Sequence, residues 1–260
     1  MDQFGIEFNG ILVGWVADVV NEKMGPDNLD KITDISFQCG TGMKKAFYDW
    51  IKDAIGGRHT KKDGTIVTAT DTHTATARLA FTGALISEIG FPALDAASKD
   101  AAKMTVRLSP RATHAVPLPP GAAARQLPAG PANPKPWLVS NFRLRIDGLD
   151  CSSVTSVGDF TITRKEPELL EIPNLVITLP ESHAGSWKRW HEAFVNNGDK
   201  AKKTGTLEYL APDMKEVLFS LSYRLSPDKV ESGSEGQNRV SAEMYCEEIK
   251  FTYAGGSTWA

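Results

Sequence analysis

The sequence contains an internal repeat that restricts the folds it can adopt. Residues 4–11, FGIEFNGI, correspond to residues 142–149, FRLRIDGL. In both stretches apolar residues alternate with others, and an Asn-Gly or Asp-Gly pair follows, which is a strong short-range signal of a β-hairpin. A second strand is predicted after each, in residues 11–20 and 151–165. The chain is therefore predicted to contain the same β-rich unit twice.

Each half also contains one amphipathic stretch with helical spacing, after an alternating strand. In residues 43–55 the apolar side chains recur every three or four residues, with Phe47 and Trp50 on the apolar stripe. In the second half Trp187 and Trp190 recur at the same interval. This spacing predicts one helix per half that is anchored to a sheet by these aromatic residues.

A glycine-containing corner and further strands follow each predicted helix. Gly64 in KKDGTIVTA corresponds to Gly205 in KKTGTLEYL, and both glycines are expected to turn the chain into a strand. Alternating strands then close each half, at 77–86 and 101–109 in the first and at 217–226 and 240–253 in the second. The predicted fold class is mainly β (α+β): two tandem β-sandwich or barrel domains, each with about six strands and one flanking helix.

A proline-rich stretch separates the two halves. Residues 114–137 contain many prolines and few large apolar side chains, a composition that favours an extended connector. The predicted organisation is a first domain at 1–112, a linker at 113–137 and a second domain at 138–260.

Composition and charge exclude few classes of function. They give no support for binding to a strongly charged partner. The formal net charge of −3 gives no general argument for binding to nucleic acid or to an anionic membrane. No apolar run approaches the roughly 20 residues that span a bilayer, and the first residues do not resemble a signal peptide. Cys39, Cys151 and Cys246 lack metal-ligand spacing and are expected to be reduced structural thiols, which suits the cytoplasm.

No catalytic motif stands out. The histidines lack HxxxH or HExxH spacing, and GTGMKK at 40–45 lacks the frame of a phosphate-binding loop, so Thr41 is interpreted as a possible helix N-cap. Neither GxSxG nor a Ser-His-Asp pattern is evident, although the paired carboxylates of a glycosidase remain an open possibility. We expect no enzymatic activity, no catalytic residue, no cofactor and no metal site.

Residues 50–108 resemble the core of tail tube proteins of contractile phages and of phage-derived contractile injection systems. The resemblance lies in a small set of motifs: Trp50 and Asp53, Arg58 to Ile66, Arg78 with Phe81, Pro92 to Ser98, and Met104 to Leu108. The second half resembles the family in its opening strand and in the strand before its helix. It lacks the late P-x-L-D-A motif.

This resemblance implies a structural protein. Family domains form rings around a wide β-barrel tube, with the helices on the outer wall under a sheath. Two domains per chain imply that three chains make a pseudo-hexameric ring, and stacked rings form a conduit for DNA or effector protein. The implied partners are further copies of the chain, sheath proteins and baseplate or hub proteins, without membrane insertion. Assembly is expected in the cytoplasm, followed by incorporation into a virion tail or an injection particle.

Three alternatives remain open. The first is a tube-initiating or hub adaptor protein at the baseplate. The others belong to different classes: a secreted carbohydrate-binding β-sandwich, and a hydrolase whose site is not recognised. The missing signal peptide and disulfides argue against the second alternative, and the missing catalytic pattern argues against the third.

Two kinds of segment are predicted to make subunit or ring contacts. On resemblance, the loops at 21–31 and 164–171 are expected to meet a neighbouring ring, through Lys23, Met24, Asp27, Asp30, Arg164, Lys165 and Glu168. The basic corners after the helices are expected either to be solvated or to contact another subunit, through Arg58, Lys61, Lys62, Lys202 and Lys203. Deletion of residues 23–30 is expected to give soluble protein that no longer polymerises.

Overall fold

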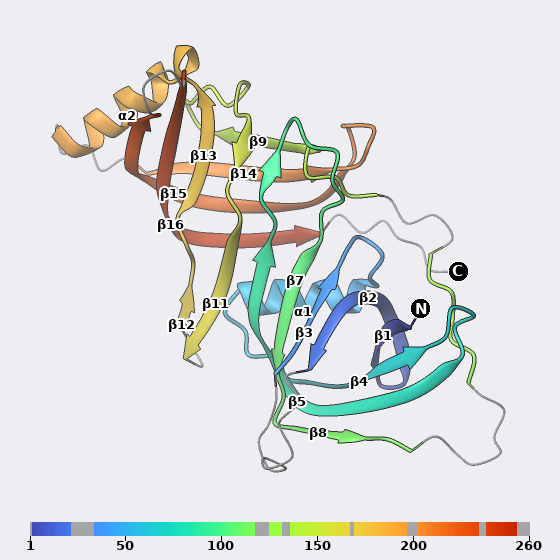
Figure 1. The fold of residues 1–260 in the computed structure, drawn as a ribbon. Helices are drawn as coiled ribbons and strands as arrows, with labels where there is room; N and C mark the ends of the chain where they lie inside the picture. The colour runs from blue at the N-terminus through green and yellow to red at the C-terminus, as the bar shows by residue number, and fades with distance from the viewer. Residues whose placement is uncertain are drawn as a thin grey trace.

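Two β domains follow one another along the chain, so the predicted fold class is confirmed (Figure 1). The computed structural model describes residues 2–21, 34–117, 125–131, 136–166, 169–196, 202–233 and 238–253. No helix in these ranges is long and apolar enough to cross a lipid bilayer.

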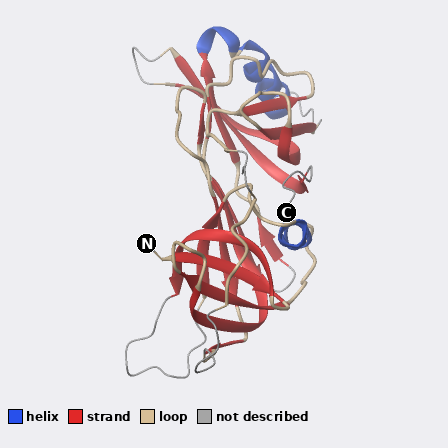
Figure 2. Cartoon of the chain, turned by 90° about the vertical axis from the view of Figure 1, so that its right-hand side faces the viewer, coloured by secondary structure: helices blue, strands red, loops and turns tan. Residues whose placement is uncertain are grey.

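The first domain is a closed six-stranded barrel, seen in the lower part of Figure 2. Its strands run in the order β5-β4-β1-β2-β3-β7, and pairing between β5 and β7 closes the ring. Closure depends on the length of β5, whose first half pairs with β4 and whose second half pairs with β7. The strands are β1 Gln3–Phe8, β2 Ile11–Asn21, β3 Ile35–Cys39, β4 Lys62–Ala69, β5 Ala75–Phe91 and β7 Met104–Ser109, and β8 Ala112–Ala115 also pairs with β5.

The second domain is a curled seven-stranded half-barrel. Its strand order is β6-β10-β13-β16-β15-β14-β9, and within the described residues β9 pairs only with β14. The sheet therefore stays open where the first domain closes. The strands are β6 Leu94–Asp95, β9 Phe142–Ile146, β10 Ser156–Val157, β13 Leu175–Pro180, β14 Lys203–Leu210, β15 Val217–Ser232 and β16 Arg239–Tyr253.

The sequence repeat reappears in the register of the strands. In the barrel, Ile6 of β1 lies opposite Ile66 of β4. In the half-barrel, Leu144 of β9 lies opposite Leu207 of β14. These are the residues that the repeat aligns, so the duplication predicted from sequence is also a duplication of strand pairing.

One part of the repeat alignment was wrong by two residues. If the expected strands 77–86 and 217–226 corresponded residue by residue, Phe81 would match Leu221, whereas the structure aligns Phe81 with Tyr223. Phe81 of β5 lies opposite Gly64, and Tyr223 of β15 lies opposite Gly205. Because side chains alternate with a period of two, a two-residue slip leaves every inward-facing residue inward, and the apolar pattern cannot detect it.

One helix accompanies each domain. The first, α1, spans Lys45–Ile55, and the second, α2, spans Gly185–Asn196 after a 3-10 turn. The N-cap of α1 is Lys44, without a side-chain capping bond, so the interpretation of Thr41 as N-cap was wrong. The backbone N–H of Lys44 donates to the Val13 carbonyl at 2.6 Å, which fixes the start of the helix against β2.

The predicted end of α1 at the glycine pair is confirmed. Gly57 has a φ of 76°, a left-handed conformation that glycine adopts without steric cost. Its N–H donates to the Ala54 carbonyl at 3.3 Å, and the N–H of Arg58 donates to the Asp53 carbonyl at 2.8 Å. Together these bonds form a Schellman motif that satisfies the last carbonyls of the helix.

The four aromatic residues singled out as helix anchors all lie in a core that continues through both domains. Phe47, Trp50 and Trp187 are almost completely buried, and Trp190 is 9% exposed. The indole N–H of Trp50 donates to the Thr60 carbonyl at 2.7 Å, which ties the helix to the corner that follows it.

The described part of the proline-rich stretch lies against the domains. Leu127 is buried in a small cluster with residues of the barrel, and its N–H donates to the His73 carbonyl at 2.9 Å. The indole N–H of Trp15 donates to the Pro128 carbonyl at 3.1 Å. Trp137, at the other end, packs edge-on against Tyr209 of the half-barrel. The boundaries at 112 and 138 stay a prediction, but the stretch between them includes residues of both cores.

Candidate assembly surfaces

The two domains exchange strands with one another. β11 (Phe160–Glu166), from the second half of the chain, pairs with the end of β5 in the barrel, with Phe160 opposite Phe91 and Ile162 opposite Ile89. In return, β6 of the first half pairs with β10 in the half-barrel. This reciprocal pairing joins the two domains of the chain through backbone hydrogen bonds.

The predicted contact loop at 164–171 belongs to this exchange. It is a hairpin of β11 and β12 (Leu169–Glu171), and Lys165 pairs with Glu171 across it at 2.8 Å. The Arg164 guanidinium contacts Nδ1 of His59 and donates from Nε to the Ile86 carbonyl at 3.3 Å. Partial burial lowers the pKa of Arg164. Arg164 therefore makes a contact between the two domains of one chain.

Helix α1 forms a second part of the contact between domains. The Tyr48 ring stacks on Tyr253 of β16, with ring centroids 4.0 Å apart, and lies near Phe251. The Tyr48 hydroxyl donates to the Gly40 carbonyl at 2.7 Å, and burial raises the pKa of this phenol. The buried aromatic stack and the shared strands together join the domains through apolar and backbone contacts.

The first basic corner, predicted as a subunit contact, is solvent-facing in the monomer. Arg58 is largely exposed and pairs with Asp53 at 3.4 Å. Lys61 is exposed, and the Lys62 ammonium lies 5.1 Å from the centroid of the Phe8 ring.

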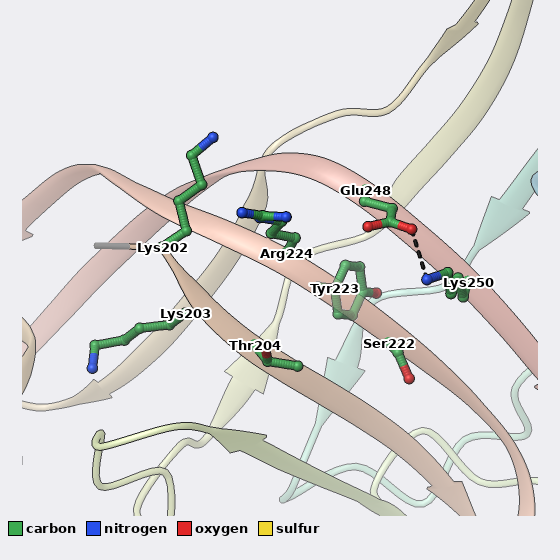
Figure 3. Close-up of a pocket in the computed structure, with 8 residues that line it drawn as sticks. All are labelled: Lys202, Lys203, Thr204, Ser222, Tyr223, Arg224, Glu248 and Lys250. Carbon is green, nitrogen blue, oxygen red and sulfur yellow. Dashed lines mark ion pairs between the residues drawn. The ribbon is translucent and has the colours of Figure 1, made fainter. Parts of the chain in front are cut away.

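The second basic corner borders a shallow pocket of about 300 Å³ on the half-barrel (Figure 3). Lys202 pairs with Glu247 at 2.5 Å. Lys203 donates to the Asp147 carbonyl at 2.7 Å, and its ammonium lies 5.7 Å from the Trp190 ring centroid. Both corners therefore place a lysine against an aromatic ring near the helix.

The remaining charges of this pocket partly compensate one another. Lys250 pairs with Glu248 at 2.7 Å, as the dashed line in Figure 3 marks, and Arg224 lies 3.8 Å from Glu247. Five of the predicted contact residues lie outside the described part of the chain: Lys23, Met24, Asp27, Asp30 and Glu168. The assignment of all these residues to subunit contacts stays a prediction.

The cysteines have the properties of structural thiols. Burial raises the pKa of Cys39 and of Cys246 to about 12, and that of Cys151 to about 11. A thiol with such a pKa is almost entirely protonated at neutral pH and is a poor nucleophile. Within the described residues, no group of three or more His, Cys, Asp or Glu side chains is arranged to hold a metal ion.

Sequence reasoning missed a buried ionic cluster that holds the linker. Glu7 is fully buried, and its carboxylate lies 3.3 Å from Nη2 of Arg78 and 3.0 Å from Nη2 of Arg125. Arg125, from the proline-rich stretch, also donates to the Gly10 carbonyl at 2.8 Å. The sequence signal for this cluster was Glu7 itself, a glutamate inside an alternating strand. Its partner Arg125 lies far along the chain, in the proline-rich stretch, and could not be identified from the pattern.

Comparison with known proteins finds a family model that is similar to most of the first domain. Residues 15–112 match the family model described as T4-like virus tail tube protein gp19. The resemblance to tail tube proteins, expected from the sequence, is thereby confirmed for this segment of the chain.

A solved structure titled "Structure of Hcp1 from Flavobacterium johnsoniae" is also similar in part. It is 16% identical, with a TM-score of 0.32, and the similarity covers 48% of this chain and 98% of that chain. A likeness of this degree carries no functional argument. No curated protein matches the chain.

Proposed function

We propose that the protein is a structural inner-tube subunit in which both domains occupy positions in one ring. Three chains then form a pseudo-hexameric ring, and rings stack into a hollow conduit for DNA or protein cargo. The observation that carries the proposal is the repetition, in residues 142–253, of the strand order and register of the domain that matches the tail tube family. A closed ring of such domains would cover sheet edges that a single chain leaves open.

The two faces of the second sheet support this proposal. In β14, β15 and β16 the inward residues are buried and apolar, while the opposite face carries mainly hydroxyl and charged side chains: Thr206, Glu208, Ser220, Ser222, Lys250 and Thr252. A polar, hydrogen-bonding face of this kind suits the wall of a water-filled channel. The proposed partners are other copies of the chain, a surrounding sheath, and baseplate or hub proteins.

The fusion of two tube domains in one chain also favours a second candidate, a tube-initiating or hub adaptor at the baseplate. Such a protein would form a single ring that starts the tube. A stacked tube of this chain alone would favour the inner-tube function, and single rings that bind only one end of a separate tube would favour the adaptor.

Negative-stain electron microscopy of the purified protein tests the proposal. We expect rings with a central hole, or stacked tubes. A dispersed monomer at high protein concentration would contradict both the tube and the adaptor functions.

A further inference from the structure

Residues 125–128 of the proline-rich stretch, which we call the strap, lie across the outer surface of the barrel. The N–H of Ala75, the first residue of β5, donates to the Arg125 carbonyl at 3.0 Å. At the other end of the strap, the Pro128 carbonyl accepts a hydrogen bond from the indole N–H of Trp15 in β2 at 3.1 Å. The strap is therefore bound to the barrel through its backbone at both ends.

A buried carboxylate of the barrel binds the side chain of the first strap residue. Glu7 is fully buried, and its Oε1 lies 3.0 Å from Nη2 of Arg125 while its Oε2 lies 3.3 Å from Nη1. Arg78 of β5 also contacts Oε2 at 3.3 Å. A carboxylate that loses a partner in a buried position is strongly destabilising, so Glu7 requires the strap as much as the strap requires Glu7.

An apolar patch lies beneath the strap. Leu127 is 3% exposed and packs in a cluster that includes Leu12 and Val67. Val67 lies opposite Gly5, where an added Cβ would lie 2.6 Å from Cδ1 of Leu12, so a residue larger than glycine would displace this leucine. Ile66, the neighbour of Val67, belongs to the main core inside the barrel, and Val67 therefore faces outward.

The repeat gives this outer surface a counterpart on the half-barrel. In the barrel, Gly5 of β1 lies opposite Val67 of β4. At the equivalent place in the half-barrel, Arg143 of β9 lies opposite Glu208 of β14, and Glu208 lies opposite Ser220 of β15. The surface that bears the strap is therefore equivalent to the polar face of the second sheet, to which Glu208 and Ser220 belong.

The side chains of the counterpart do not suit a strap. Arg143 and Glu208, an ion pair at 2.5 Å, replace the glycine and the valine of the barrel. The position of the buried carboxylate is taken by Arg145, whose side chain is 64% exposed. Burial of a leucine such as Leu127 against these charged groups would remove them from water at a cost in free energy. The strap is thus specific to the barrel, although the surfaces are equivalent by repeat.

We propose that the strap lies on the wall of the channel in the assembled ring. This inference rests on the proposed inner-tube function, in which the polar face of the half-barrel lines the channel. Domains in equivalent positions of a ring present equivalent surfaces to its centre. The barrel accordingly presents the surface that bears the strap.

The wall of such a channel has three-fold rather than six-fold symmetry. Each of the three chains contributes one surface covered by its strap and one polar surface, and the two kinds alternate around the ring. The straps add a layer of backbone over the sheet and narrow the channel at three places. Cargo in the channel meets these straps and, between them, the hydroxyl and charged side chains of the half-barrels.

Gold labels on single introduced cysteines test this arrangement. Ala129→Cys places a thiol at an exposed position directly after the strap, Thr252→Cys places one on the polar face, and Lys52→Cys places one on the exposed side of α1 as a control. Burial raises the pKa of all three native thiols, so a maleimide-coupled gold cluster should react mainly with the introduced cysteine. Wild-type rings treated with the same reagent measure the background.

The labels are attached after the rings have formed and are located in end-on electron micrographs. We expect gold at three sites inside the central hole for Ala129→Cys and for Thr252→Cys, and outside the hole for Lys52→Cys. Gold outside the hole for Ala129→Cys, with gold inside it for Thr252→Cys, would overturn the inference and leave the proposed function intact. Gold outside the hole for Thr252→Cys would overturn the inference at its premise, whereas wild-type protein that forms no rings would contradict the proposed function itself.

Discussion

Gly64 shows how closely the barrel strands approach one another. A Cβ atom at this position would lie 2.4 Å from Cζ of Phe81 and 2.5 Å from the Glu7 carbonyl oxygen. Its counterpart Gly205 is less crowded, with Cδ1 of Leu225 at 3.0 Å. Both glycines lie within strands, so the expectation that they turn the chain was wrong. Their function is to let neighbouring side chains cross the backbone.

Gly64→Ala is therefore expected to destabilise the barrel by about 1–3 kcal/mol, the usual cost of overpacking. Gly205→Ala should cost less, because the nearest atoms to its added Cβ, in the side chains of Leu225 and Ile146, lie at 3.0 and 3.1 Å rather than at 2.4 Å. Gly40→Ala is the matched control, since no atom lies within 4 Å of its added Cβ. Urea unfolding measures all three, and a Gly64→Ala protein as stable as Gly40→Ala would contradict the packing described.

At the scale of elements, the hairpin of β11 and β12 decides how the domains are joined. Ile162 is 2% exposed and lies opposite Ile89 of the barrel, although 73 positions separate them in the sequence. Neighbouring Thr161 has an exposed side chain. The hairpin therefore adds buried apolar area to the contact between domains as well as backbone hydrogen bonds.

Ile162→Ala is expected to lower the free energy of unfolding by about 2–5 kcal/mol, the range for truncating a buried isoleucine. Thr161→Ala, on the exposed side of the same strand, should change it by less than about 1 kcal/mol. Hydrogen exchange should also become faster at the end of β5 in Ile162→Ala. Equal effects of the two substitutions would argue against the burial of Ile162 between the domains.

The helices and strands could be predicted from the sequence more reliably than the sheets on which they lie. Alternation and helical spacing depend on local burial, so the strands, both helices and the duplication could be derived from residues alone. Residues 151–165, by contrast, were predicted as one strand, whereas the chain leaves the half-barrel at Gly158 and continues as β11 on the barrel. A pattern of buried residues shows that a strand is covered but not which sheet covers it. The buried Leu127 was missed for a similar reason, because its proline-rich surroundings favour an extended, exposed chain.

At the scale of the whole molecule, the two β domains are joined by shared strands and by a core that continues through both. β11, from the second half of the chain, pairs with the barrel, and β6, from the first half, pairs with the half-barrel. In the proposed ring, two domains joined in this way would occupy neighbouring positions, and contacts with other copies would cover the sheet edges that remain exposed in a single chain.

The mass of the smallest closed particle tests the central claim most directly. If both domains of each chain occupy positions in a pseudo-hexameric ring, native mass spectrometry of isolated rings should give three chains of 28.3 kDa. A ring of six chains would mean that only one domain of each chain takes a position in the ring, and would contradict the account.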